Sequence, residues 1–455
     1  MKILCKFSIL IVAIIHLIQP FFPSDLSLFL FFDTLILLVS VIPFQTASFK
    51  KITLSFLFLG TLLLTYGNQP LSIWVKTATS MTNVIAILVV MQLFTLPIAT
   101  GKYSDVIGFW LNRSFTKESS LFLFTTLVTH LFSSFLLFGT VPIMISLFGQ
   151  GLQKSVSHFE RFTSAAVARG YALVVLWSPG AVNVFLVLQA TGVQWIDLLV
   201  PGLLLSLIGI VLSYFLERTM VLSKKPLTII QTSSDLSLSQ AKRKSIHIFA
   251  VVFGLISATI LFEKLHIGSN ASRIILAGLL VSVIWLSNYI NNPKLPGVLK
   301  DYWETGVLKS LDLAGLFVAM GLFAGAVDHM GILTLIQPYL QYWANEIGIF
   351  SIMLVPLFMI TLAMIGIHPF ILIIMLGKLL TALHLPISNV SLALALSLGG
   401  AISYILSPFG GIVLTLAKFI NAKSIDIAFK WNITFSTIYL AIGILFSYLW
   451  GLMVS

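Results

Sequence analysis

Long apolar segments separated by short polar ones run along almost the whole chain of 455 residues. About 20 apolar residues in a helix cross the hydrocarbon core of a bilayer, which is roughly 30 Å thick. The pattern therefore predicts an all-α polytopic membrane protein with about 11 transmembrane helices. The spanning candidates are 3–20, 26–45, 52–67, 80–100, 162–192, 195–217, 246–263, 271–290, 311–328, 388–419 and 431–450.

Two further apolar stretches, 120–150 and 349–383, are too long for one untilted crossing. A helix of 30 residues measures about 45 Å, against a core of roughly 30 Å. Helix-disfavouring residues interrupt both, at Gly139-Thr140-Val141-Pro142 and at Gly366-Ile367-His368-Pro369. We interpret each stretch as a re-entrant hairpin that enters and leaves on one side, the alternative being a kinked spanning helix.

Landmarks of different composition recur in one order at nearly one spacing. Pro142 and Pro369 stand 227 residues apart, and Ser178-Pro179 and Ser407-Pro408 stand 229 apart. The interpretation is an internal duplication with a broken helix in each half. The predicted organisation is an N-terminal transmembrane helix (1–24), repeat 1 (25–218, hairpin 120–150, broken helix 162–192), a cytoplasmic linker (219–245) and repeat 2 (246–455, hairpin 349–383, broken helix 388–419).

Basic residues set the predicted orientation. The linker carries Lys224, Lys225, Lys242, Arg243 and Lys244, whereas 329–349 carries no Lys or Arg. Because cytoplasmic loops are enriched in Lys and Arg, we expect a cell-membrane protein with a cytoplasmic N-terminus. Each repeat then crosses five times, an odd number, so the two repeats are inverted relative to each other.

Composition agrees with a lipid-embedded chain, since 58% of residues are hydrophobic and 9% are charged, against about 25% charged in soluble domains. The net charge of +11 is spread over short loops, so no nucleic-acid partner is expected. The single cysteine, Cys5, excludes an intrachain disulfide and a cysteine metal cluster. No metal site is expected, and no cofactor other than a sodium ion or proton as coupling ion.

The helix interruptions are the candidate site. Irregular backbone at membrane depth is tolerated only where protein or a water cavity surrounds it. Half-helix N-termini offer N–H groups to an anion, and paired breaks in two inverted halves are typical of a transporter's central site.

With these elements the chain resembles the ion transporter superfamily: divalent-anion/sodium symporters, citrate and arsenite carriers, and the large permease subunit of TRAP transporters. The resemblance rests on the order hairpin, broken helix and closing helix in each half, around Ser178-Pro179-Gly180 and Ser407-Pro408-Phe409-Gly410-Gly411. It implies a scaffold domain near helices 1–4 and 7–9 and a transport domain of both hairpins and both broken helices. It also implies a homodimer that works by an elevator motion.

Carried over residue by residue, the resemblance implies a substrate and ion site with two halves. The symporters carry Ser-Asn-Thr at each hairpin tip, and this chain lacks both asparagines, so their dicarboxylate and two-sodium scheme is not implied. Hydroxyl and carbonyl oxygens suit a hard cation such as sodium. The candidates are Ser133, Ser134, Gly139, Thr140, Ser178, Gly180 and Asn183 in the first half, and Thr361, Gly366, His368, Ser407, Gly410, Gly411 and Thr415 in the second.

Ionisable residues inside membrane segments are functional candidates. Arg169 either attracts an anion or extends to the inner interface. His130 and His368 lie in the two hairpins, where a proton-coupled carrier would use them, or they are hydrogen-bonded core residues.

The function expected from these features is secondary active transport of a small anion, an organic carboxylate, coupled to sodium or protons. The alternatives within transport are a metalloid or inorganic-anion exporter, a TRAP-type permease subunit and a cation/proton antiporter, against which the scarcity of membrane-embedded acids counts. An intramembrane enzyme is disfavoured, because the sequence has no Asp-x-x-Asp or His-Glu-x-x-His motif.

Overall fold

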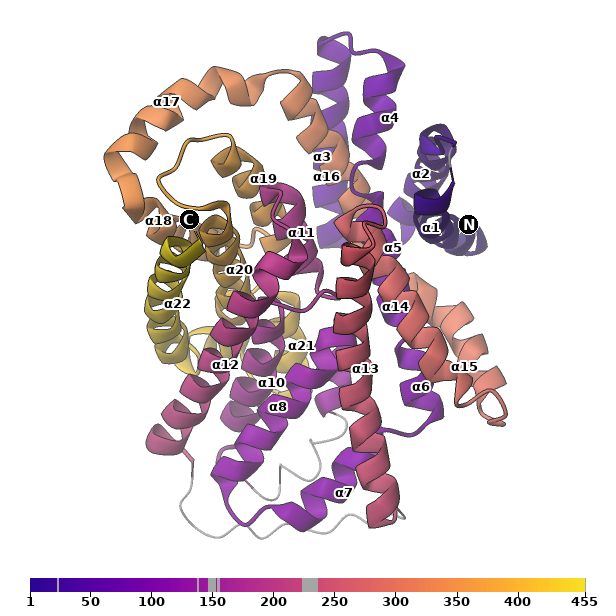
Figure 1. Cartoon of the computed structure of the whole chain (residues 1–455), viewed down its shortest axis with the longest axis vertical. Coiled ribbons are helices and arrows are strands. Elements are labelled where there is room, and N and C mark those ends of the chain that lie inside the picture. The colour runs from indigo at the N-terminus through magenta and orange to yellow at the C-terminus, as the bar shows by residue number, and fades with distance from the viewer. Residues whose placement is uncertain (23, 137–138, 146–152, 154–155, 223–235, 455) are drawn as a thin grey trace. The chain divides into compact units, whose positions relative to one another are not determined.

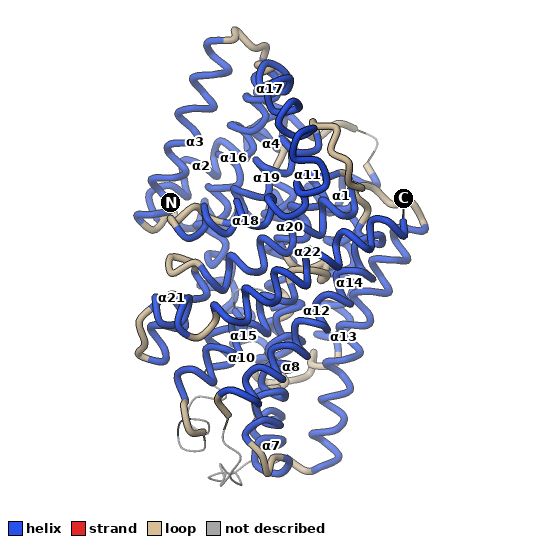
Figure 2. Tube along the Cα trace, turned by 90° about the vertical axis from the view of Figure 1, so that its left-hand side faces the viewer, coloured by secondary structure: helices blue, strands red, loops and turns tan. Residues whose placement is uncertain are grey.

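The computed structural model describes residues 1–22, 24–136, 139–145, 153, 156–222 and 236–454. Within these ranges every regular element is a helix and no strand occurs (Figures 1 and 2). Twelve of the described helical segments are long and apolar enough to cross a membrane, judged by length and composition. This confirms the all-α polytopic class that the apolar pattern predicts.

Residues Met1–Thr100 and Leu255–Trp343 form one compact unit, called unit 1. Its longest helices coincide with predicted spans, but the short helix α4 (Leu71–Thr79) was not predicted, because it is brief and contains Lys76. The helices of unit 1 are α1 (Lys2–Ile18), α2 (Ser27–Val41), α3 (Ala47–Tyr66), α4, α5 (Thr82–Gln92), α6 (Thr95–Thr100), the end of α13 (Leu238–Lys264), α14 (Asn270–Ser287), α15 (Leu295–Asp301), α16 (Leu311–His329) and most of α17 (Ile332–Ile347).

Residues Gly101–Gly254 and Ala344–Ser455 form the second compact unit, called unit 2. Both predicted hairpin stretches and both predicted broken helices belong to it, although 137–138 and 146–150 of the first hairpin and 223–235 of the linker lie outside the described residues. The helices of unit 2 are α7 (Ser104–Ser114), α8 (Glu118–Leu136), α10 (Phe159–Val174), α11 (Val182–Thr191), α12 (Trp195–Met220), the start of α13, α18 (Ser351–Met364), α19 (Pro369–Thr381), α20 (Asn389–Leu406), α21 (Gly411–Ile420) and α22 (Ile433–Val454).

Helices end at the predicted interruptions for local reasons. Proline lacks a backbone N–H and disfavours the helical conformation of the residue before it. Accordingly α20 ends before Ser407, which is extended (φ −78°, ψ 114°), and α21 begins at Gly411. Between α18 and α19 the backbone turns at Gly366 with φ +101°, a conformation that glycine adopts without a steric penalty.

Matched contacts recur in the two halves of unit 2. The Ser178 hydroxyl donates to the Ser134 carbonyl at 2.7 Å, and the Ser407 hydroxyl donates to the Ala363 carbonyl at 2.7 Å. Each bond joins residues 44 apart, and the second bond lies 229 residues after the first. An internal duplication predicts this pattern.

Glycines also occupy equivalent packing positions, Gly170 on α10 and Gly399 on α20, again 229 residues apart. A Cβ at Gly170 would lie 2.7 Å from the Thr126 carbonyl of α8, and one at Gly399 would lie 2.8 Å from the Met359 sulfur of α18. Each half therefore brings its hairpin helix close to its broken helix at a glycine.

We expect the Gly170→Ala variant to unfold at a lower temperature than the wild type, because the added methyl group overlaps the α8 backbone. Overpacking of this kind costs about 1–3 kcal/mol. Gly108→Ala is the control, since a Cβ there meets no atom within 4 Å and alanine favours a helix. Melting curves in detergent would compare them, and equal midpoints for the two variants would contradict the packing argument.

Candidate functional site

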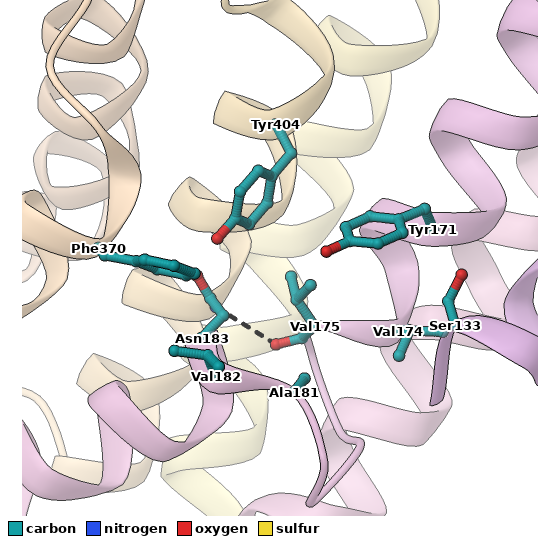
Figure 3. Close-up of a pocket in the computed structure, with 9 residues that line it drawn as sticks. All are labelled: Ser133, Tyr171, Val174, Val175, Ala181, Val182, Asn183, Phe370 and Tyr404. Atoms are coloured by element: carbon teal, nitrogen blue, oxygen red, sulfur yellow. Dashed lines mark hydrogen bonds between the residues drawn. The ribbon is translucent and has the colours of Figure 1, made fainter. Parts of the chain in front are cut away.

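A small cavity of about 10 Å³ lies in unit 2 where helix ends meet (Figure 3). This is room for about one water molecule, so a larger ligand fits only when the surrounding helix ends move apart. Its walls come from α8, from the end of α10 and start of α11, and from α19 and α20. The lining residues are Ser133, Tyr171, Val174, Val175, Ala181, Val182, Asn183, Phe370 and Tyr404.

Two helices begin at the wall of the cavity. Ala181, Val182 and Asn183 are the N-cap and first two residues of α11, and no side chain caps this helix. Phe370 is the second residue of α19. Helix N-termini present N–H groups and the positive end of the helix dipole. At α19 Pro369 has no N–H and His368 accepts from the Phe370 N–H, so the N–H groups without a side-chain cap are those of α11. The site is therefore suited to negative charge although none of its nine lining residues is charged.

Two buried polar atoms of lining residues, the Ser133 hydroxyl and the Asn183 side-chain carbonyl oxygen, have no hydrogen-bond partner among the described residues. The two residues are 2% and 1% exposed. The Asn183 amide nitrogen donates to the Val175 carbonyl at 3.3 Å (Figure 3), which fixes the side chain at the break. Because an unsatisfied buried polar group costs about 1–3 kcal/mol, these two atoms are the natural contacts for a ligand.

Aromatic rings frame the cavity. The rings of Tyr171 and Tyr404 lie edge to face with centroids 6.2 Å apart, and Phe370 contacts Tyr404 in the same way at 6.1 Å. The hydroxyl groups of the two tyrosines point toward the space between the rings (Figure 3). An apolar frame with a few polar groups is typical of sites for small organic molecules.

The predicted residues of the first half fall into two groups. Ser133 and Asn183 line the cavity. Ser178 and Ser134 do not line it, because they form the hydrogen bond between the first break and α8, and Ser134 also donates to the Leu131 carbonyl at 2.7 Å. Gly180 is buried within the break. Gly139 and Thr140 follow the residues that are not described, and the buried Thr140 hydroxyl has no partner among the described residues.

None of the predicted residues of the second half lines the cavity. Ser407 bonds the Ala363 carbonyl, and His368 caps α19 by accepting from the Phe370 N–H at 3.3 Å. The hydroxyls of Thr361 and Thr415 donate within their own helices, to Leu357 and to Gly411. Gly366, Gly410 and Gly411 shape the turns before α19 and α21.

Arg169 is buried and bonded on all sides, away from the cavity. Its guanidinium donates to Glu217 at 2.9 Å, to Asn432 at 2.8 Å and to Ser213 at 3.2 Å, and it lies over the Phe435 ring at 4.6 Å. It does not extend to the inner interface, because it is 1% exposed. These contacts tie α10 and α12 of one half to α22 of the other.

Sequence reasoning missed the aromatic frame of Tyr171, Tyr404 and Phe370. The sequence holds a weak signal for the two tyrosines, since each precedes the Ser-Pro pair of its own broken helix. Tyr171 stands seven residues before Ser178, and Tyr404 stands three residues before Ser407. Among the described residues no group of three or more His, Cys, Asp or Glu is placed to hold a metal ion.

No protein-family model matches the chain. No curated protein matches it either. Solved transporter structures match the chain, and two of them are described here. The YdaH transporter of Alcanivorax borkumensis has a TM-score of 0.63 at 14% identity, covering 89% of this chain and 98% of its own. MtrF of Neisseria gonorrhoeae, whose structure illuminates a class of antimetabolite efflux pumps, has a TM-score of 0.51 at 14% identity, covering 83% and 84%.

The likeness shows a shared fold. The chain is a multi-pass membrane protein with the fold of these transporters. This supports the transporter architecture that the sequence resemblance implies, while membership of the ion transporter superfamily stays an expectation.

Proposed function

We propose that the protein is a secondary active transporter that carries a small organic anion, a carboxylate, in the cavity of unit 2. The observation that carries this proposal is the coincidence of three features in one place. The start of α11 has no side-chain cap, the Ser133 hydroxyl and the Asn183 oxygen have no hydrogen-bond partner in the part of the chain that the structure describes, and aromatic rings lie beside them.

The anionic character of the substrate follows from these groups. The uncapped N–H groups of α11 and the Ser133 hydroxyl donate hydrogen bonds to a carboxylate. The rings of Tyr171, Tyr404 and Phe370 contact its carbon skeleton. An inorganic or metalloid anion would use the same donors but would leave the aromatic frame without a role.

Alternating access by an elevator motion is supported by the division of the chain. The whole cavity belongs to unit 2, so this unit can carry the substrate as a transport domain. Unit 1 is then the scaffold, and a homodimer through unit 1 completes the proposed mechanism in the cell membrane.

Sodium is the favoured coupling ion. The Asn183 carbonyl oxygen and the Ser133 hydroxyl are hard oxygen ligands of the kind that sodium takes. Of the two histidines considered for proton coupling, His130 uses both ring nitrogens in hydrogen bonds to Gly170 and Trp177, and His368 caps α19 through the Phe370 N–H.

Export is the second candidate for the direction of transport. Its support is the fold shared with MtrF, one of a class of antimetabolite efflux pumps. A TRAP-type permease, which needs a separate binding protein, is distinguished by failing to transport without one.

A thermal-shift panel on the purified protein tests the substrate class. A ligand at a hundredfold excess over its Kd stabilises the folded protein by about 2.7 kcal/mol. We therefore expect a small carboxylate to raise the melting temperature in sodium, and to raise it only weakly when choline replaces sodium, the proposed coupling ion. Asn183→Ala should lose the shift, while Thr191→Ala, on the far end of α11 with its hydroxyl bonded to Val187, should keep it. Shifts with cations or oxyanions alone would overturn the carboxylate assignment.

A further inference from the structure

The two helix breaks of unit 2 stand at equivalent positions but are held very differently. Several side chains fix the first break, residues 175–181. The Ser178 hydroxyl donates to the Ser134 carbonyl, the Trp195 indole donates to the Trp177 carbonyl at 2.9 Å, and Asn183 donates to the Val175 carbonyl at 3.3 Å. Two carbonyls of the break, those of Val175 and Trp177, are thereby bonded from α11 and α12, and the Ser178 hydroxyl bonds a carbonyl of α8.

His130 adds a fixed link from α8 to the first break. The Gly170 carbonyl can only accept, so the Nδ1 of His130, 3.0 Å away, carries the proton. The Nε2 therefore has a lone pair that accepts from the Trp177 indole N–H at 3.1 Å, which can only donate. Both ring nitrogens of the neutral His130 imidazole therefore form hydrogen bonds, one as donor and one as acceptor. The bond to the indole N–H holds the Trp177 side chain in one orientation.

Close packing completes the first break. A Cβ at Gly202 of α12 would overlap the Leu176 carbonyl, so the α12 backbone lies directly against the interruption. All residues from 171 to 188 are buried. The first break is therefore closely packed, and its Val175 and Trp177 carbonyls are hydrogen-bonded by side chains.

The second break, residues 404–410, lacks this support. Among the described residues its one side-chain hydrogen bond is that of Ser407 to Ala363. At the positions equivalent to His130, Trp177 and Asn183 the chain has the apolar Met359, Leu406 and Ile412, and none of these side chains can form the equivalent bond.

The second break is exposed at one residue, whereas its other residues are buried. Phe409 is 62% exposed, whereas its equivalent in the first break, Gly180, is buried. A Cβ at Gly411 would meet no atom within 4 Å. The turn before α19 rests on this same ring, since a Cβ at Gly366 would lie 3.7 Å from Phe409.

We propose that the second break and the adjoining turn at 364–369 form the gate that admits substrate to the cavity, while the first break is a fixed wall. The gate adjoins the cavity directly. Tyr404, at the start of the second break, and Phe370, just after the turn, both line the cavity. His130 and Trp195 are positioning residues, which hold the wall without touching the substrate. This inference rests on the proposed transport function.

Hydrogen–deuterium exchange followed by mass spectrometry tests the gate on the full-length protein in lipid nanodiscs without substrate. Weakly supported segments open at lower free energy and exchange faster. We expect backbone amides of 404–410 to exchange at least about tenfold faster than those of 175–181. Equal rates, or faster exchange at 175–181, would overturn the proposal whatever the substrate is.

Three variants sharpen the comparison. Trp195→Phe keeps the ring but removes the bond to Trp177, and it should speed exchange at 175–181 without altering 404–410. Ser407→Ala should speed exchange at 404–410 more than Ser178→Ala speeds exchange at 175–181, because the first break keeps its other bonds. An equal response to the two serine substitutions would contradict the inference. Since no transport is measured, failure of the transport proposal would appear separately, in the ligand panel.

Discussion

Replacing Glu217 by glutamine lowers the free energy of unfolding by about 3–5 kcal/mol, because it leaves the charge of Arg169 buried without a counter-ion. Glutamine has nearly the shape of glutamate and keeps an oxygen that can accept a hydrogen bond, so the change isolates the charge. The Arg169 guanidinium lies 2.9 Å from the Glu217 carboxylate, and both side chains are almost fully buried. Reversible unfolding in mixed micelles would measure the loss.

Two further variants make this prediction specific. Arg161→Gln removes the other partner of Glu217, which is 3.2 Å away and 28% exposed, and should cost only about 0–1 kcal/mol, as partly exposed ion pairs do. Adding Arg169→Met to Glu217→Gln should recover part of the loss, because no charge then stays buried. Similar losses for Glu217→Gln and Arg161→Gln would show that the buried pair does not govern stability.

Replacing Asn183 by aspartate weakens binding of an anionic substrate by roughly a thousandfold. Two like charges about 4 Å apart repel by about 4 kcal/mol at an effective dielectric constant near 20, and each 1.4 kcal/mol is about a factor of ten in affinity. The substitution is nearly isosteric and places the charge at the wall of the cavity, where the Asn183 oxygen has no hydrogen-bond partner within the described ranges. Isothermal titration of the carboxylate found in the ligand panel would measure the change.

Gln189→Glu is the matched control for this variant. Gln189 lies on the same helix, six residues after Asn183, on the exposed side and outside the cavity. The added charge should leave affinity within about twofold, because exposed charges are screened over about 10 Å. Stronger binding of the substrate by Asn183→Asp would mean that the substrate is not an anion.

The interruptions of the helices could be predicted from local sequence. Proline and glycine act on their own neighbours, so the ends of α10, α18 and α20 follow from Ser178-Pro179, Gly366 and Ser407-Pro408. The repeat spacing also pointed to equivalent contacts, which the structure contains as the bonds of Ser178 and Ser407. These features depend on residues close to one another in the chain.

The composition of the site could not be predicted in the same way. The partners of Arg169 stand 48 residues away, at Glu217, and 263 away, at Asn432, and no local pattern connects them. For the same reason the cavity joins Ser133 of α8 to Phe370 of α19 and Tyr404 of α20. The predicted residues that line this cavity, Ser133 and Asn183, both come from the predicted repeat 1, and a second, equivalent half-site stays a prediction.

Flux of a carboxylate across proteoliposomes containing the purified protein tests the central claim most directly. The account predicts uptake or release that requires a sodium gradient, is abolished by Asn183→Asp and is preserved by Gln189→Glu. Flux that is unaffected by Asn183→Asp would contradict the placement of the substrate in the cavity of unit 2. The proposed function would be contradicted if folded and inserted protein carried no small anion under a sodium gradient or a proton gradient.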